Sequence, residues 1–299
     1  MHHPGYAAPL NEVDQTDVAV RVETLLAGDV SRTQTPSPVP SATASPATTL
    51  TLIPTLTPSP SPTPTLTPSP TWQSVFAGEV YVPILLYHRV VEGQENNRYA
   101  VSPEAFEEQM RYLAENGYTT ITPVHLARVI LNGGELPERP VIITFDDGYA
   151  DTYTTAFPIM EKYHLRGALY VITSYVGISG RVDLEQLRDL AAHGWEIGTH
   201  TLTHTDLTQH HERIGIELSQ SRQILEEWLG SPILTVAYPY GRVDEYVLNR
   251  TRRYGFTAGM GLGILNRHTP GTLYYLSRRE VRADYDLDQF IDLLSVPQP

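Results

Sequence analysis

Short apolar runs rich in β-branched residues alternate with helical segments along most of this 299-residue chain. Such alternation is typical of parallel strands joined by crossover helices, because two parallel strands need a long connection between them. The part of the chain after Trp72 also falls within the roughly 200–250 residues that α/β barrels occupy as one domain. We therefore predict one α/β domain over residues 73–299, with strands at 82–87, 141–145, 168–173, 196–199, 235–238 and 257–260.

Two of the connecting segments carry clear helical signals. In the first, Ser102 and Pro103 are typical of a helix N-terminus and Gly117 of a helix end. In the second, Gly230 follows the last apolar residue. Each segment has one apolar face, made by Phe106, Met110 and Leu113 in the first and by Ile214, Leu218, Leu225 and Trp228 in the second. We assign both apolar faces to the protein core.

Residues 33–71 differ in composition from the rest of the chain. They hold 11 of the 24 prolines and 18 Ser or Thr residues, carry no charge, and repeat TLTPSP at 55–60 and 65–70. This composition cannot bury enough apolar surface to fold, and its prolines favour an extended chain. We predict a disordered Pro/Thr/Ser-rich linker over residues 33–72. Such segments are often glycosylated stalks outside the cytoplasm, and a plain linker is the alternative.

The first 32 residues form a separate segment to which we assign no function. Residues 17–27 are compatible with one short helix, and no apolar run is long enough for a signal peptide or a membrane anchor. We expect no membrane span in the chain. The predicted stalk nevertheless favours an extracytoplasmic or cell-surface location.

The chain is acidic and lacks cysteine. It has 21 Lys and Arg against 34 Asp and Glu, a net charge of −13 with histidine neutral. Because nucleic-acid phosphates are bound by clustered cations, we expect no nucleic-acid partner. Without cysteine, His and carboxylate side chains are the expected protein ligands for a metal. We also expect the protein to be a monomer.

Two adjacent carboxylates, Asp146 and Asp147, directly follow the predicted strand 141–145 and precede Gly148. One interpretation is a strand-to-helix turn in which an aspartate caps the next helix. The other interpretation is chemical, with one carboxylate binding a cation while its neighbour transfers a proton. The position makes the second interpretation worth testing, because reactive residues in barrels gather where strands end.

His200 and His204 follow the predicted strand 196–199 with the spacing H-x-x-x-H. If this turn is helical, both imidazoles lie on one face and can reach one Zn²⁺, and the alternative is a pair of surface or capping residues. Together with the two carboxylates they make the set needed for a two-His, one-carboxylate metal with a carboxylate base beside it. A third strand end carries Tyr240, whose backbone N–H could stabilise an oxyanion, with a Pro-Gly turn as the alternative.

These motifs resemble those of a known family. TFDDG at 144–148, HTLTH at 200–204 and AYPYG at 237–241 are similar to the first three motifs of the polysaccharide deacetylase family, the NodB-homology domain of carbohydrate esterase family 4. The resemblance spans residues 83–294, with PILLYHRV at 83–90 and LYVITSYVG at 169–177. The YH opening and the YPYG form most resemble the branch that acts on cell-surface and biofilm poly-N-acetylglucosamine.

The resemblance implies a distorted (β/α) TIM-like barrel of the NodB-homology fold. It also implies a divalent metal held by Asp147, His200 and His204, with Zn²⁺ expected and Co²⁺ or Ni²⁺ as alternatives. Asp146 would be the general base that takes a proton from the attacking water. The backbone N–H of Tyr240 would share the resulting oxyanion with the metal.

One motif departs from the family pattern. Many relatives have a histidine general acid in a C-terminal L-x-H motif, and the matching segment here ends in Arg278. A guanidinium, with a pKa above about 12, cannot donate a proton near neutral pH. Arg278 could instead orient Asp146, replacing the arginine that usually precedes the third motif. The acid would then be His88 after the first strand, His268 before the last strand, or Asp146 itself, and position favours His88.

We therefore expect a metal-dependent hydrolase that removes N-acetyl groups from an N-acetylglucosamine-containing polysaccharide of cell-wall or biofilm type and releases acetate. An O-deacetylase of an acetylated glycan such as xylan is the enzymatic alternative. A catalytically silent glycan-binding domain is the alternative from another class. The missing L-x-H histidine favours that last reading, and the intact Asp146, Asp147, His200 and His204 disfavour it.

Overall fold

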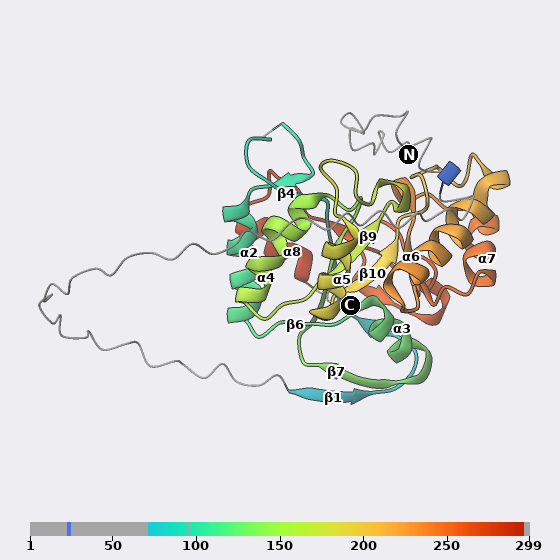
Figure 1. Ribbon diagram of the computed structural model, residues 1–299. Coiled ribbons are helices and arrows are strands. Elements are labelled where there is room, and N and C mark those ends of the chain that lie inside the picture. The colour runs from blue at the N-terminus through green and yellow to red at the C-terminus, as the bar shows by residue number, and fades with distance from the viewer. Residues whose placement is uncertain (1–22, 25–70, 95, 296–299) are drawn as a thin grey trace, which may run out of the picture.

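The computed structural model describes residues 23–24, 71–94 and 96–295 (Figure 1). Its central sheet joins parallel strands in the order β12-β11-β10-β9-β8-β3-β14, and the short β6 (Thr119–Thr120) also pairs with β8. The strands are β3 (Ile84–Tyr87), β8 (Pro140–Phe145), β9 (Ala168–Val171), β10 (Glu196–Thr199), β11 (Thr235–Ala237), β12 (Ala258–Met260) and β14 (Arg279–Glu280). Each of the six predicted strand segments overlaps one of them, so these predictions are confirmed.

The two ends of the sheet come together. The Gly261 N–H, just after β12, donates to the Leu276 carbonyl at 2.8 Å, and the Gly263 N–H donates to the Arg278 carbonyl at 3.0 Å. β14, which follows, pairs with β3. Glycine is required here because a Cβ on Gly261 would lie 2.4 Å from the Tyr275 ring. The predicted distorted (β/α) barrel is confirmed.

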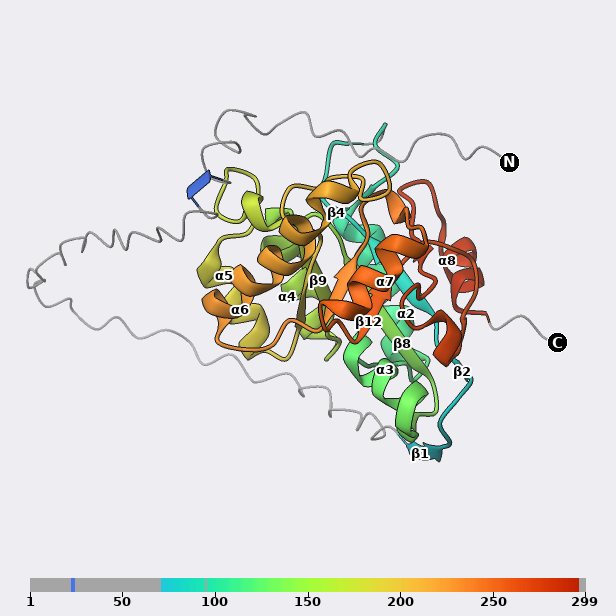
Figure 2. The same cartoon turned by 90° about the vertical axis from the view of Figure 1, so that its right-hand side faces the viewer.

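Helices cover the outside of this barrel (Figures 1 and 2). As predicted, the Ser102 side chain caps the first long helix by accepting from the Ala105 N–H, and Pro103 is its first residue. The helices are α2 (Pro103–Glu115), α3 (Pro123–Asn132), α4 (Phe157–Lys162), α5 (Leu184–Ala192), α6 (Ser221–Leu229), α7 (Glu245–Arg253) and α8 (Leu287–Leu294).

The second predicted helix departs from regular α-helix at its beginning. Residues Gly215–Gln220 form the π-helical segment η4, which continues into α6 and ends at Gly230 in the left-handed region, with φ 66°. The Glu217 carbonyl in this segment accepts from the Leu202 N–H at 3.1 Å. A helix carbonyl drawn toward a neighbouring loop favours such a local widening.

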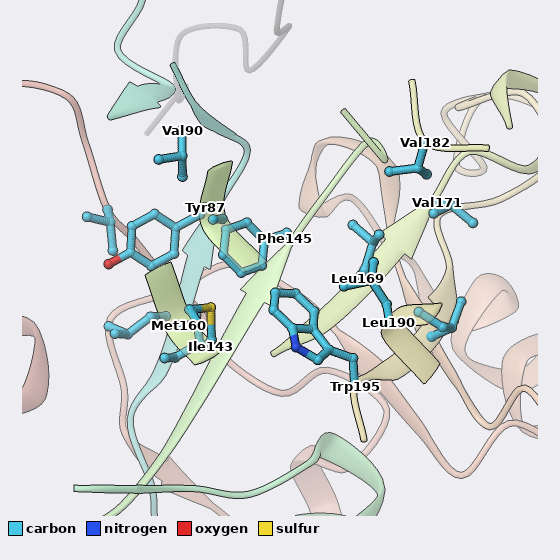
Figure 3. Close-up of a cluster of buried hydrophobic side chains, with 14 of the residues drawn as sticks. Tyr87, Val90, Ile143, Phe145, Met160, Leu169, Val171, Val182, Leu190 and Trp195 are labelled. Carbon is cyan, nitrogen blue, oxygen red and sulfur yellow. The ribbon is translucent and has the colours of Figure 1, made fainter. Parts of the chain in front are cut away.

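The core consists of two layers, one on each face of the sheet. On the outer face, Phe145 stacks on Tyr87 with ring centroids 5.4 Å apart and on Trp195 at 5.5 Å (Figure 3). Successive strand residues alternate between layers, so that Ile143 joins this outer cluster and Ile142 joins the cluster inside the barrel. Both faces of the sheet are therefore apolar, as parallel strands under helices require.

Three small two-stranded sheets flank the barrel. They pair β1 (Trp72–Val75) with β7 (Gly134–Pro137), β2 (Val80–Tyr81) with β13 (Arg267–His268), and β4 (Arg89–Val90) with β5 (Ala100–Val101). In Figures 1 and 2, β1 lies at the bottom and β4 lies toward the top. Since β4 begins two residues after β3 ends, the carboxyl end of β3 lies at this upper edge. This upper edge is the carboxyl end of the parallel sheet.

The predicted N-terminal segment and linker lie outside the described residues, apart from residues 23–24 and 71–72. Trp72, which we assigned to the end of the linker, is the first residue of β1. Within the described part of the chain, no helix is both long enough and apolar enough to cross a membrane.

Candidate active site

The predicted site residues meet at the carboxyl ends of four strands. His88 follows β3, Asp146 and Asp147 follow β8, and the two histidines of the H-x-x-x-H motif follow β10. Because parallel strands all end at the same edge, these side chains converge there. These five side chains line one small cavity together with two more of the predicted site residues. The seven are His88, Asp146, Asp147, His200, His204, Tyr240 and Arg278.

Three of these residues have the geometry of a metal site. Asp147 Oδ1 lies 3.5 Å from His200 Nε2 and 3.6 Å from His204 Nε2. Tetrahedral ligands about 2.0–2.1 Å from a Zn²⁺ ion would stand about 3.3 Å apart. Asp147 Oδ1 is buried without a hydrogen-bond partner among the described residues. The donor set therefore fits a divalent metal, and it is also the set of ligands expected from the sequence.

Each imidazole presents a ring nitrogen to Asp147. His200 Nδ1 lies 2.8 Å from the Ala237 carbonyl and donates to it, which leaves the lone pair on Nε2 facing Asp147. Burial and the neighbouring His200 lower the pKa of His204 to about 4. The His204 ring is therefore neutral near pH 7, as a ligand must be.

The two histidines do not lie on a helical turn, which was the condition under which their spacing would place both imidazoles on one face. Residues 200–206 form an irregular loop, in which Thr201 has φ 68° and His204 has φ 62°. The N–H groups of Leu202 and Thr203 donate to Glu217 and not to backbone four residues earlier, so no helical turn closes. The imidazoles converge because left-handed residues fold the loop back on itself.

Glu217 organises this loop, and the sequence analysis missed it. Its carboxylate is buried and accepts from the Thr203 N–H at 2.8 Å, the Thr203 hydroxyl at 2.6 Å and the Thr205 hydroxyl at 3.2 Å. Arg213 pairs with the same carboxylate at 2.9 Å. The available signal was a charged residue on the apolar face of the second predicted helix, three residues after Ile214.

Asp146 and Arg278 form a buried ion pair. Two parallel hydrogen bonds of 2.7 and 2.6 Å join the guanidinium to the two carboxylate oxygens. Arg278 also donates to the Gly261 carbonyl at 3.1 Å and to the Thr144 hydroxyl at 3.2 Å, so it is fixed on three sides. Burial raises the pKa of Asp146, but the charge and hydrogen bonds of Arg278, together with the nearby His200 and His88, outweigh burial and lower it to about 2. The arrangement is the one expected of a residue that orients Asp146.

The structure separates two of the candidates for the general acid. His88 lines the cavity, its ring lies 4.6 Å from the Tyr99 ring, and its Nδ1 is buried without a hydrogen-bond partner in the described part of the chain. His268 is fully buried on β13, and its Nε2 donates to the Val82 carbonyl before β3, at the opposite end of that strand. His268 is therefore excluded from the site.

Tyr240 lies beside the metal ligands. It has φ 60° in the turn Pro239–Gly241, and its ring lies 4.7 Å from the His204 ring. A second missed residue, Arg181, donates to the Asp147 carbonyl at 2.9 Å and packs 3.8 Å over the Tyr149 ring. Arg181 comes from an irregular loop with no periodic pattern, so no sequence pattern indicated its role.

The comparison with family models decides the assignment. The model described as polysaccharide deacetylase matches residues 133–259, which include both carboxylates, both histidines and Tyr240. These residues form a polysaccharide deacetylase domain. The resemblance inferred from the three motifs is therefore confirmed. The deacetylase family acts on acetylated polysaccharides.

Individual relatives agree with this assignment. The protein YxkH of Bacillus subtilis (strain 168) is 31% identical over 182 residues, covering 60% of this chain. A poly-β-1,6-N-acetyl-D-glucosamine N-deacetylase of Staphylococcus aureus (strain MRSA252) is 27% identical over 184 residues, covering 56%. The chain spans 63% of the length of each of these two curated relatives.

Solved structures of deacetylases have the same fold. The deacetylase PplD of Streptococcus pyogenes, in complex with acetate, has a TM-score of 0.67 and 25% identity, covering 72% of this chain and 99% of that one. IcaB from Ammonifex degensii has a TM-score of 0.61 and 26% identity, covering 73% and 97%. Almost three quarters of this chain thus aligns with almost the full length of both neighbours.

Proposed function

We propose that this deacetylase is metal-dependent and removes N-acetyl groups from N-acetylglucosamine units of a cell-wall or biofilm polysaccharide. The observation that carries the proposal is the position of Asp146, held by Arg278, beside the ligand set of Asp147 and the two histidines. His200 Nε2 lies 3.9 Å from Asp146 Oδ2, so a base and a metal ligand face the same small cavity.

In this proposal Asp147, His200 and His204 hold one divalent metal. Zn²⁺ suits two imidazoles and a carboxylate, and Co²⁺ and Ni²⁺ are the alternatives. When bound, the metal supplies a Lewis acid that polarises the acetamide carbonyl and makes water more acidic.

The remaining residues move protons and stabilise charge. Asp146 is ionised near neutral pH and accepts a proton from the attacking water, while Arg278 fixes the direction of its carboxylate. The Tyr240 backbone N–H donates to the oxyanion that forms on the former carbonyl. His88 donates a proton to the leaving amine, so that acetate and a free amino sugar are released.

Two further parts of the proposal concern the substrate and its location. The Staphylococcus aureus relative is a poly-β-1,6-N-acetyl-D-glucosamine N-deacetylase, which supports a polymer of N-acetylglucosamine as the substrate. The Pro/Ser/Thr composition of residues 33–71 supports action outside the cytoplasm.

Acetate release from an N-acetylglucosamine oligomer, measured with Zn²⁺ present, tests this function. We expect release by the wild-type protein and its loss in the Asp146→Asn variant, which keeps the size of the side chain but cannot accept the proton. Release from acetylated xylan alone would replace the proposal with an O-deacetylase. No release from either polymer, with one metal bound per chain, would favour a silent glycan-binding domain.

A further inference from the structure

A second, larger cavity opens beside the active site. Its volume is about 800 Å³, and Tyr240, Leu262 and Glu280 line both cavities. It lies between the loop after β12 and the region of β14, where the two ends of the sheet meet. A polymer whose acetyl group enters the small cavity would therefore extend into this one.

Arginine dominates the charge of this second cavity. Besides Arg278, which is paired with the catalytic carboxylate, four arginines line it and Glu280 is the one carboxylate among its lining residues. The chain as a whole has a net charge of −13, so this concentration of cations runs against its composition. The four residues, which we call the arginine groove, are Arg98, Arg242, Arg279 and Arg282.

Three of these arginines pair with carboxylates: Arg98 with Glu280, Arg242 with Asp206 and Arg282 with Asp284. Arg279 has no ion-pair partner among the described residues, so it leaves positive charge in the groove. Arg279 donates to the backbone carbonyls of Asp292 and Leu293 at 3.0 Å each, and a carbonyl does not neutralise its charge. Arg242 is about half exposed and pairs with Asp206 at 2.7 Å. A guanidinium has five N–H donors, so an arginine in one ion pair can still bind a phosphate or carboxylate.

Aromatic rings in the same cavity suit a sugar. Tyr240, Tyr275 and Tyr285 line it and are half-buried, so part of each ring is accessible. The hydroxyl of Tyr275 donates to the Gly241 carbonyl at 2.9 Å, which fixes that ring. Rings held in this way offer a flat apolar surface with a polar rim, which matches the face of a sugar. Cations beside such rings match a sugar that carries an anion.

We propose that the arginine groove binds a sugar unit that carries a phosphate or carboxylate group, next to the unit that is deacetylated. This inference rests on the proposed function, since it names the substrate class of the same site. A neighbouring sugar that has already lost its acetyl group carries a protonated amine, and the groove disfavours it by charge repulsion. The groove therefore selects anionic polymers and spaces the deacetylated units apart.

The test compares kcat/KM for acetate release from three N-acetylglucosamine oligomers of equal length: neutral, phosphorylated, and bearing one carboxylate. We expect the wild-type protein to prefer an anionic oligomer by about tenfold, which is the factor that about 1.4 kcal/mol gives. The two anionic oligomers decide between phosphate and carboxylate. In the Arg242→Gln, Arg279→Gln double variant the ratio of anionic to neutral kcat/KM should fall to about one. Salt at about 0.5 M should also reduce it.

The matched control is Arg250→Gln, because Arg250 is on α7, bonds to the Tyr246 hydroxyl and does not line the groove. If the double variant fails to fold, Arg242→Gln alone replaces it. A wild-type ratio of one, or a ratio that survives the substitutions, would overturn this inference while leaving the proposed function intact. If no oligomer is deacetylated, calorimetric binding of the phosphorylated and neutral oligomers still decides the inference, because it needs no turnover.

Discussion

Arg278 holds both carboxylate oxygens of Asp146 through parallel hydrogen bonds of 2.7 and 2.6 Å, in a site where both side chains are almost fully buried. Two planar groups joined in this way fix one another in position and direction. The arginine stands where many relatives have a histidine acid. In the proposed mechanism this position therefore orients Asp146 and does not donate a proton.

The first prediction concerns this pair. Arg278→Lys keeps the charge but loses the planar fork, so we expect kcat to fall about 10- to 100-fold with bound metal unchanged. Because Arg278 acts through Asp146, the substitution should add little to the effect of Asp146→Asn in the double variant. Steady-state kinetics and metal analysis of the three variants check this. Full additivity would show that Arg278 acts independently of Asp146.

A second prediction concerns the loop that carries the histidines. Glu217→Gln leaves a neutral group that cannot accept all of the hydrogen bonds from Thr203 and Thr205, so the position of His204 becomes less fixed. We expect Zn²⁺ affinity, measured by competition with a chelator, to fall about 10- to 100-fold. Glu212→Gln is the control, because Glu212 is exposed. Equal Zn²⁺ affinity in both variants would refute a role for Glu217 in positioning the ligand.

His88 is predicted to protonate the leaving amine. His88→Ala should abolish turnover, while the protein still binds one metal per chain, because the three proposed ligands remain. His210→Ala is the control, since His210 is exposed and pairs with Glu212. Acetate release and metal content are measured on the same samples. Unchanged turnover would remove His88 from the mechanism and leave Asp146 to return the proton.

His268 gives a prediction about acid stability. Burial lowers the pKa of His268 to about 4, below the ordinary value of 6.5. As the pH falls from 6.5 to 4, the unfolded chain takes up a proton that the folded chain refuses, so the free energy of unfolding decreases by up to about 3 kcal/mol. In His268→Gln this part of the decrease should vanish. Urea unfolding at pH 7, 5.5 and 4 measures it, and equal pH dependence in both proteins would contradict the assignment.

Local patterns were enough to predict most of the fold. The strands were predicted because each is a short apolar run, and α2 because Ser102, Pro103 and Gly117 mark its ends. The donor set was predicted from the resemblance of TFDDG and HTLTH to the family motifs, because position after a strand left open which of Asp146 and Asp147 would bind the metal. These features are determined by residues that are close together in the sequence, so local sequence patterns are enough to predict them.

Features that depend on tertiary contacts were not predicted. The H-x-x-x-H spacing fits a helix. In the structure the Thr203 N–H donates instead to the carboxylate of Glu217, fourteen residues later in the chain, so no helical turn forms there. Left-handed backbone at Thr201 and His204 is uncommon for residues other than glycine, and no local pattern signals it. The contact of Arg181 with the Asp147 carbonyl likewise joins two loops that only the folded barrel brings together.

The most direct test of the account is a metal titration of the chelator-treated protein with acetate release as the readout. We expect no release before Zn²⁺ is added, a rise that ends at one equivalent per chain, and no rise in a His200→Ala variant. Full release from protein shown to be free of metal would contradict the central claim that Asp147, His200 and His204 hold the metal this deacetylase uses.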